Sequence, residues 1–104
     1  MWIYVLEQPI VGTTDVIIKY CSLNNANLTN FANTNNIYGN INGRFPLFDI
    51  NGLTEIYSVV IENNGKWVDI GQYFKLKADA VAFVTKYSTI YKTQKFKVDT
   101  IQVI

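Results

Sequence analysis

The sequence predicts an α+β fold: a mostly antiparallel sheet of five or six strands with one main helix, at about residues 78–91, packed on one face. Three observations support this prediction. Several short runs are rich in β-branched and aromatic residues, an Asn64-Gly65 pair separates two of them, and a later segment repeats apolar residues at helical spacing. The 104 residues, 49% of them hydrophobic, are enough for a single domain around one core.

The strongest local signal is a hairpin formed by Glu55–Asn63 and Lys66–Phe74. A type I′ turn needs positive φ at both central residues, which Asn followed by Gly adopts at low cost. A two-residue turn also fixes the register of the two strands. Three predicted pairs form an aliphatic face and three a mixed polar face, and we expect the polar face to meet water. The pairs are Ile61 with Val68, Val59 with Ile70 and Tyr57 with Gln72, then Glu62 with Trp67, Val60 with Asp69 and Ser58 with Gly71.

The segment after this hairpin has the apolar spacing of one helix face, which we expect to cover the aliphatic face of the hairpin. Lys77 is a poor N-cap, so we expect Leu76 and Val81 to compensate as a hydrophobic staple. The apolar positions are Ala80, Phe83, Val84, Tyr87 and Tyr91.

The first 23 residues predict a second hairpin. Trp2–Leu6 carries bulky residues on both faces, which is typical of a central strand covered on both sides. Pro9 ends this strand because proline cannot donate to a ladder, and Asp15–Leu23 forms the next one. Cys21 lies in that strand, and we interpret it as a small core residue because the chain has no histidine to activate it.

Residues 24–43 are compositionally unusual, since nine of these twenty residues are asparagine. Asparagine favours turns over helices and strands, so we predict a long loop in which Leu28, Phe31 and Ala32 permit a short helical turn. Two interpretations remain open, a passive surface loop and a recognition loop whose side chains contact a partner. In the second case the contact residues are Asn35, Asn36 and Tyr38.

Two more strands complete the predicted sheet. Asn51-Gly52 closes a hairpin onto Leu53–Ile61, which makes Leu47–Ile50 a short edge strand. Phe96–Ile104 forms the last strand, but Phe96 and Val98 share one parity whereas Ile101 and Val103 share the other. We prefer a bulge near Asp99-Thr100, which places all four on one side, and the alternative is a strand end buried on both faces.

The sequence predicts neither catalysis nor a cofactor. It has no histidine and one cysteine, which excludes a histidine base and a structural zinc site, and we expect no metal. The acidic residues do not pair by spacing, and the glycines form no phosphate-binding loop. No apolar run is long enough to span a membrane, and no secretory signal is visible. We therefore expect a cytoplasmic protein, located in the host cytoplasm or the virion if a phage encodes it.

Our first functional prediction is a small non-catalytic protein that docks on a protein partner or on itself. Chains of this size and composition occur among phage and mobile-element accessory products, such as inhibitors of host machinery and minor virion components. We expect the contact to use Trp67 on the polar face of the hairpin, with Tyr73 and the Asn-rich segment, because aromatic side chains dominate protein interfaces.

The alternative is sequence-tolerant nucleic-acid binding by the C-terminal part. Seven of the nine Lys and Arg residues follow residue 64, and aromatic residues lie between them, a combination that single-strand grooves use. A single arginine argues against sequence-specific DNA recognition. The lysines chosen for this role are Lys75, Lys77, Lys92, Lys95 and Lys97.

Overall fold

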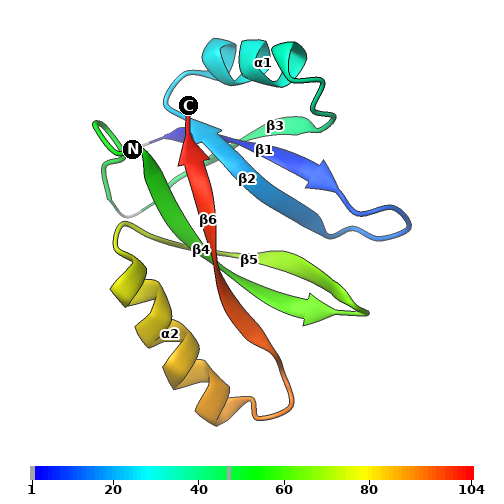
Figure 1. Cartoon of the computed structure of the whole chain (residues 1–104), viewed down its shortest axis with the longest axis vertical. Helices are drawn as coiled ribbons and strands as arrows, with labels where there is room; N and C mark the ends of the chain where they lie inside the picture. Colours follow the sequence, from blue (N-terminus) through cyan, green and yellow to red (C-terminus); the bar gives the residue numbers. More distant parts are fainter. Residues whose placement is uncertain (1, 47) are drawn as a thin grey trace.

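The computed structural model describes residues 2–46 and 48–104 and shows an α+β fold (Figure 1). In this part of the chain six strands form one mixed, curled sheet in the order β3-β1-β2-β6-β4-β5, and two helices lie outside it. The strands are β1 (Ile3–Pro9), β2 (Val16–Ser22), β3 (Asn40–Arg44), β4 (Glu55–Asn63), β5 (Lys66–Phe74) and β6 (Phe96–Val103), and the helices are α1 (Asn25–Thr34) and α2 (Lys77–Ile90).

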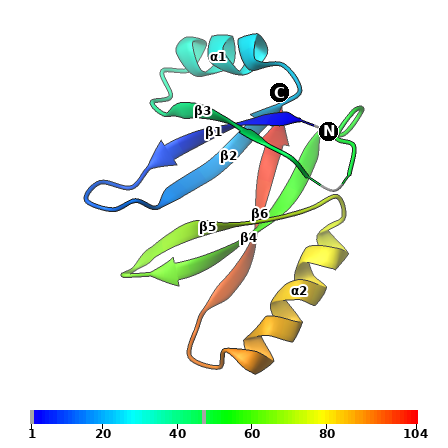
Figure 2. The ribbon, with the colours of Figure 1, turned by 180° about the vertical axis from the view of Figure 1, so that it is seen from behind.

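The prediction of a mostly antiparallel sheet was wrong, because β2 and β6 run parallel. They pair at Tyr20 with Gln102 and at Cys21 with Val103, and then diverge, as both views of the ribbon show (Figures 1 and 2). This junction divides the sheet into a β1 half (β3-β1-β2) and a β4 half (β6-β4-β5), each antiparallel within itself. A parallel pair needs a long crossover connection, which local sequence patterns do not specify.

The core has one cluster between the two halves and a second beneath α1. The first contains Ile3, Val5, Ile18, Cys21, Ile50, Ile56 and Ile101, and the second contains Leu6, Leu28 and Ala32. Since β1 contributes to both clusters, the prediction of a central strand covered on both faces is confirmed. Burial of Cys21 likewise confirms its interpretation as a core residue.

The predicted hairpin register is confirmed next to the turn and wrong beyond it. Ile61 pairs with Val68, Glu62 with Trp67 and Val60 with Asp69, and Asn64 and Gly65 have φ values of 52° and 78°. Farther along, Ser58 lies opposite Tyr73 and Tyr57 opposite Phe74, rather than Gly71 and Gln72. The cause is a bulge in β5, where Gly71 has a φ of 79° and Val59 falls in the irregular stretch.

Helix α2 covers the aliphatic face of the β4 half, as predicted. Phe74 pairs with Tyr57 on that face, and its ring contacts Phe83 of α2 at a centroid distance of 5.6 Å. The opposite face, predicted to meet water, is the inner face of the curl. Ser58 and Val60 are buried on it, because the parallel junction brings the β1 half over this side of β4.

The prediction of a loop over residues 24–43 was wrong, because this segment contains α1 and most of β3. The side chain of Asn24 caps α1 by accepting a hydrogen bond from the Asn27 N–H (3.1 Å). Leu28 and Ala32 are one turn apart and are buried against Leu6. Tertiary packing of this short apolar stripe therefore overrides the low helix propensity of asparagine.

The predicted boundaries of α2 are confirmed to within one residue, but the predicted staple was wrong. Leu76 is the N-cap residue and makes no side-chain capping bond, and both Leu76 and Val81 are exposed. The helix begins one residue earlier than expected, so these two side chains do not occupy the staple positions.

Two predictions for the remaining strands were also wrong. Phe48–Ile50 forms no strand, and Leu47 lies outside the described residues; Ile50 is instead buried in the core. Within its described pairing with β4, β6 runs without a register shift, so it has no bulge near Asp99-Thr100. The alternative, a strand end buried on both faces, was wrong as well, because Ile101 faces the core between the halves whereas Thr100 and Gln102 on the opposite face are exposed.

Candidate functional site

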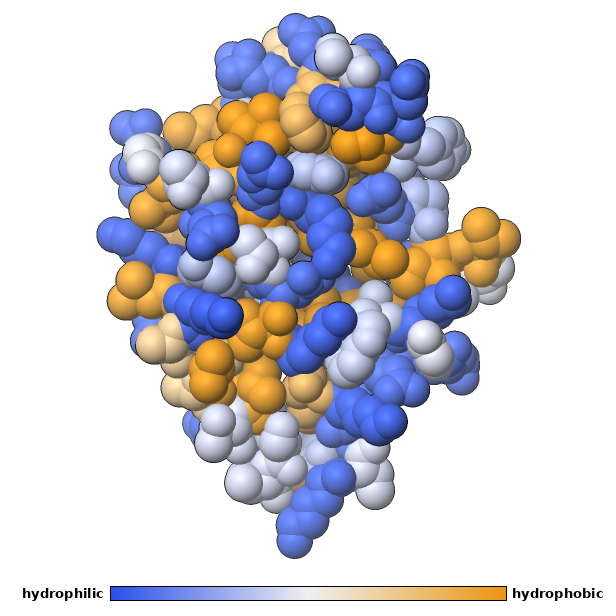
Figure 3. All heavy atoms as spheres, viewed as in Figure 1, coloured by the Kyte–Doolittle hydropathy of each residue, from blue (hydrophilic) through white to orange (hydrophobic). Residues whose placement is uncertain are grey.

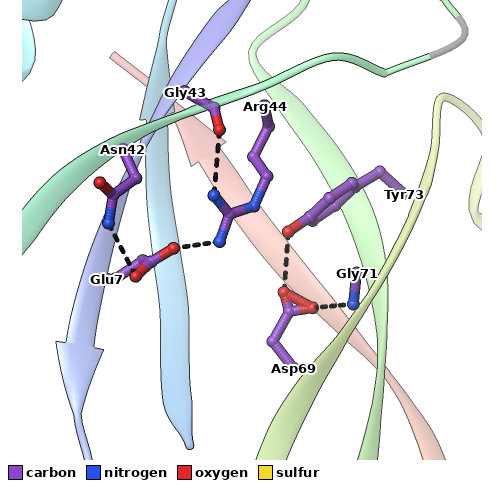
Figure 4. Close-up of polar contacts among 7 residues, drawn as sticks. All are labelled: Glu7, Asn42, Gly43, Arg44, Asp69, Gly71 and Tyr73. Carbon is purple, nitrogen blue, oxygen red and sulfur yellow. Dashed lines mark hydrogen bonds and ion pairs between the residues drawn. The ribbon is translucent and has the colours of Figure 1, made fainter. Parts of the chain in front are cut away.

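A polar cluster lies where β1, β3 and β5 approach each other across the inside of the curl (Figure 4). Glu7 of β1 forms an ion pair with Arg44 of β3 and accepts a hydrogen bond from the Asn42 amide (2.9 Å). On β5 the Tyr73 hydroxyl and the Gly71 N–H each donate to the Asp69 carboxylate at 2.8 Å. Arg44 and Tyr73 point toward each other, so the cluster links the two halves of the sheet.

Burial controls the titration of this cluster. It raises the pKa of Asp69, although hydrogen bonds from Gly71 and Tyr73 oppose the shift. Burial and the nearby Asp69 charge also raise the pKa of the Tyr73 hydroxyl. Burial alone would lower the pKa of Arg44, but hydrogen bonds with Glu7 and Tyr73 raise it. Because these groups already bond to one another, the cluster is suited to holding the fold together.

The described residues bear on catalysis through their acidic side chains, the Cys21 thiol and an open hollow. They contain no group of three or more His, Cys, Asp or Glu side chains that could hold a metal ion. Burial raises the pKa of the Cys21 thiol to about 12, so the sulfur is protonated at neutral pH and is a poor nucleophile. An open hollow of about 650 Å³ between α1 and α2 is lined by Lys19, Tyr20, Thr54, Glu55, Thr100 and Gln102. Its Lys19 is already paired with Asp99.

The structure places the two predicted aromatic contact residues on the inner face of the curl. Trp67 is half-buried, and the ammonium group of Lys97 lies 4.6 Å from its ring centroid. Tyr73 is half-buried and belongs to the polar cluster. They therefore do not form an open surface with the Asn-rich segment.

The Asn-rich segment has local roles at the end of α1. Asn35 is the C-cap residue, and its side-chain amide donates to the Phe31 carbonyl (2.8 Å). Asn36 has a φ of 53°, a left-handed conformation that asparagine tolerates. Tyr38 is 81% exposed and follows these two residues, so it is the member of the predicted set that is free to contact another molecule.

The predicted lysines separate into two groups. Lys75, Lys77, Lys92 and Lys95 are exposed near the two ends of α2, and Lys95 pairs with Glu62 at 3.4 Å. Lys97 lies with Trp67 on the inner face of the sheet, away from the other four.

Sequence reasoning assigned Phe83, Tyr87 and Tyr91 to the stripe that covers the hairpin, and it missed that these aromatic rings form a partly exposed row along α2. Successive centroids are 5.6 Å apart from Phe74 to Phe83, 4.3 Å from Phe83 to Tyr87 and 6.3 Å from Tyr87 to Tyr91. We call this row, together with Ile90 one turn beyond Tyr87, the α2 surface. In Figure 3 apolar and hydrophilic residues alternate over the lower left of the molecule, where α2 lies.

The α2 surface is only partly covered by the sheet. Ala80 is buried, but Phe83 and Tyr87 are half-buried, and Ile90 and Tyr91 are 55% and 56% exposed. The sequence contained a signal that α2 is apolar beyond its buried face, since Val81 is apolar at a helix position that lies off the predicted stripe.

Comparison of the chain with models of protein families, with curated proteins and with solved structures finds no match. Of the helices in the described residues, neither has the length and apolar character to cross a membrane. Because no related protein suggests a function, we infer one from the structure alone, and we base it on the partly exposed α2 surface.

Proposed function

We propose that this protein is a non-catalytic interaction protein that docks on a protein partner, or on a second copy of itself, through the α2 surface. The observation that supports this most is the exposure along α2. A helix that only completes its own core buries its apolar stripe against the sheet, whereas Ile90 and Tyr91 remain more than half exposed. Contiguous exposed apolar side chains of this kind mark interaction sites.

The aromatic row is well suited to act as an anchor. Aromatic side chains offer a large contact area, and few of their rotatable bonds must be ordered on binding. Contact between Phe83 and Tyr87 at 4.3 Å already restricts both rings before a partner arrives. This preorganisation lowers the entropic cost of association.

The proposed contact differs from the one predicted from the sequence. Trp67 and Tyr73 lie on the inner face of the curl, so neither belongs to the α2 surface. The exposed ring of Tyr38 lies between α1 and β3, away from α2, and a role for the Asn-rich segment is not needed for this proposal.

The proposal can be tested with three immobilised baits: the parent chain, an Ile90→Ser/Tyr91→Ser variant and a Val11→Ser control. Val11 is 98% exposed at the tip of the β1–β2 hairpin, on the far side of the molecule from α2 (Figure 1). We expect proteins from a lysate to be retained by the parent and the control and lost by the α2 variant, which changes exposed positions and should keep its stability within about 0.5 kcal/mol. Sedimentation velocity of the three proteins reports self-association. If the α2 variant retains the same lysate proteins as the parent and sediments in the same way, the proposal is contradicted.

A further inference from the structure

We infer that the segment that binds the α2 surface is acidic and amphipathic, with an apolar strip flanked by Asp and Glu side chains. This inference rests on the proposed docking function and specifies the chemistry of the partner. It follows from the charge around the α2 surface and from the way its rings are arranged.

Lysines lie before, within and after the helix that carries the α2 surface. We call four of them the rim: two precede or open α2, one lies within it and one follows it, namely Lys75, Lys77, Lys86 and Lys92. The single acidic side chain of α2 is Asp79. The rim keeps its positive charge, because the ion pairs within the described residues join Lys19 to Asp99, Arg44 to Glu7 and Lys95 to Glu62 and involve none of these four lysines. An acidic partner complements this rim and approaches it faster than a neutral one.

The centre of the surface requires apolar side chains from the partner. Ile90 and the rings of Phe83 and Tyr87 expose apolar surface. A polar group of the partner that covered this surface would lose its hydration and form no hydrogen bond in return, whereas an apolar side chain gains by leaving water. From Phe83 to Tyr91 the helix rises about 12 Å at about 1.5 Å per residue, which is the length of two helical turns. A short amphipathic segment therefore covers the surface and brings its acidic flanks to the lysines.

The same lysines and rings could serve a single-stranded nucleic acid, but the ring geometry favours a protein segment. Base stacking needs accessible ring faces. Tyr87 lies 4.3 Å from Phe83, and the nearly parallel rings of Tyr87 and Tyr91 (9°) are 6.3 Å apart. The close contact of Phe83 with Tyr87 occupies part of both rings, and the neighbouring Ile90 offers an aliphatic surface that suits apolar side chains rather than bases.

The test is selection from a random peptide library, with peptides of about 16 residues, long enough to cover the row as a helix. Selection uses the full chain, with counter-selection on the Ile90→Ser/Tyr91→Ser variant. We expect the enriched peptides to carry net negative charge together with apolar residues at helical spacing. Enrichment of neutral or basic peptides, or no enrichment, would overturn the inference.

The charge dependence is then measured by fluorescence anisotropy with one enriched peptide and with a single-stranded oligothymidine. Lys75→Gln/Lys92→Gln removes two rim charges, whereas the matched control Lys66→Gln removes a charge at the far end of the β4–β5 hairpin. We expect the rim variant to weaken peptide binding by about fivefold and the control to leave it within about twofold, because each exposed charge pair is worth less than about 1 kcal/mol.

Three results separate this inference from the docking function. In the first, the parent chain retains proteins from a lysate, the Ile90→Ser/Tyr91→Ser variant does not, and the enriched peptides are not acidic. This result overturns the inference of an acidic partner but agrees with the docking function. Oligothymidine binding that is lost in the rim variant, without peptide binding, identifies a nucleic acid instead. A dimer that the α2 variant dissociates identifies a second copy of the chain as the occupant, and it overturns the inference as well.

Discussion

The ammonium nitrogen of Lys97 lies 4.6 Å from the ring centroid of Trp67, on the inner face of the curled sheet. This contact gives Trp67 a structural role in the β4 half. We expect Trp67→Ala to lower the free energy of unfolding by about 1–3 kcal/mol, less than the loss for a fully buried tryptophan because the ring is half-buried. Urea unfolding followed by circular dichroism measures the change.

Trp2 provides the matched control for this prediction. It is 61% exposed and contacts Phe45 edge-on, so Trp2→Ala removes the same side chain from a less buried position. We expect its effect to be smaller than that of Trp67→Ala. Equal losses from the two variants would show that Trp67 contributes no more to the fold than an exposed ring does.

Asp69 should make stability depend on pH. Because burial raises its pKa in the folded state, the folded chain binds more protons than the unfolded chain as Asp69 titrates. Its contribution to stability is therefore greatest below the ordinary aspartate pKa of about 3.9, and it falls as the pH rises through the raised value. Asp69→Asn keeps an acceptor for the Gly71 N–H and cannot ionise, so we expect the variant to lose this part of the pH dependence. Denaturant midpoints measured across the acid range check it, and an unchanged profile would contradict the assignment.

Gly71 should be required for its backbone conformation. Its φ of 79° is left-handed, and a Cβ added there would meet no heavy atom within 4 Å, so sterically there is room for a side chain. We expect Gly71→Ala to cost about 1–2 kcal/mol of stability, the penalty of the left-handed region for an L-residue. Asparagine visits this region more readily, so Gly71→Asn should cost less. Thermal unfolding of both variants measures the difference, and a larger loss for Asn would indicate crowding instead.

The cap of α1 gives a fourth prediction. Asn24→Ala removes the acceptor for the Asn27 N–H and should destabilise the protein by about 1 kcal/mol. Asn24→Asp keeps an acceptor and adds a charge that favours a helix N-terminus, so it should be at least as stable as the parent. Differential scanning calorimetry compares the three proteins. Equal stability of the alanine variant and the parent would show that this bond contributes nothing.

The sequence correctly predicted the tight turn at Asn64-Gly65, where both residues have positive φ. Asn64-Gly65 fixed the first four pairs of the hairpin, from Asn63 with Lys66 to Val60 with Asp69, because a two-residue turn leaves no freedom in register. The pairing beyond Val60 could not be read in the same way. Gly71 was predicted to pair with Ser58, but a glycine inside a strand also marks a bulge, and here the bulge places Tyr73 opposite Ser58.

The inner face of the curl shows why the prediction of a hairpin face that meets water was wrong, since Ser58 and Val60 are buried there. Glu62, Trp67 and Asp69 alternate with aliphatic residues, a pattern that normally indicates a wet face. The β1 half covers this face. It joins the β4 half at the β2–β6 junction, where Lys19 pairs with Asp99, 80 residues away in the sequence. Local periodicity contains no information about a contact of that range.

The position of β6 in the chain sets the order in which this molecule can fold. β6 follows the other described elements in sequence, yet it lies in the middle of the sheet. The β1–β2 and β4–β5 hairpins have short connections and can form as soon as they leave the ribosome. The junction between them forms only when residues 96–103, which make up β6, are available to pair with both β2 and β4. Contacts between distant parts of a chain form slowly, and until this last strand arrives the two hairpins expose unpaired edges to other nascent chains.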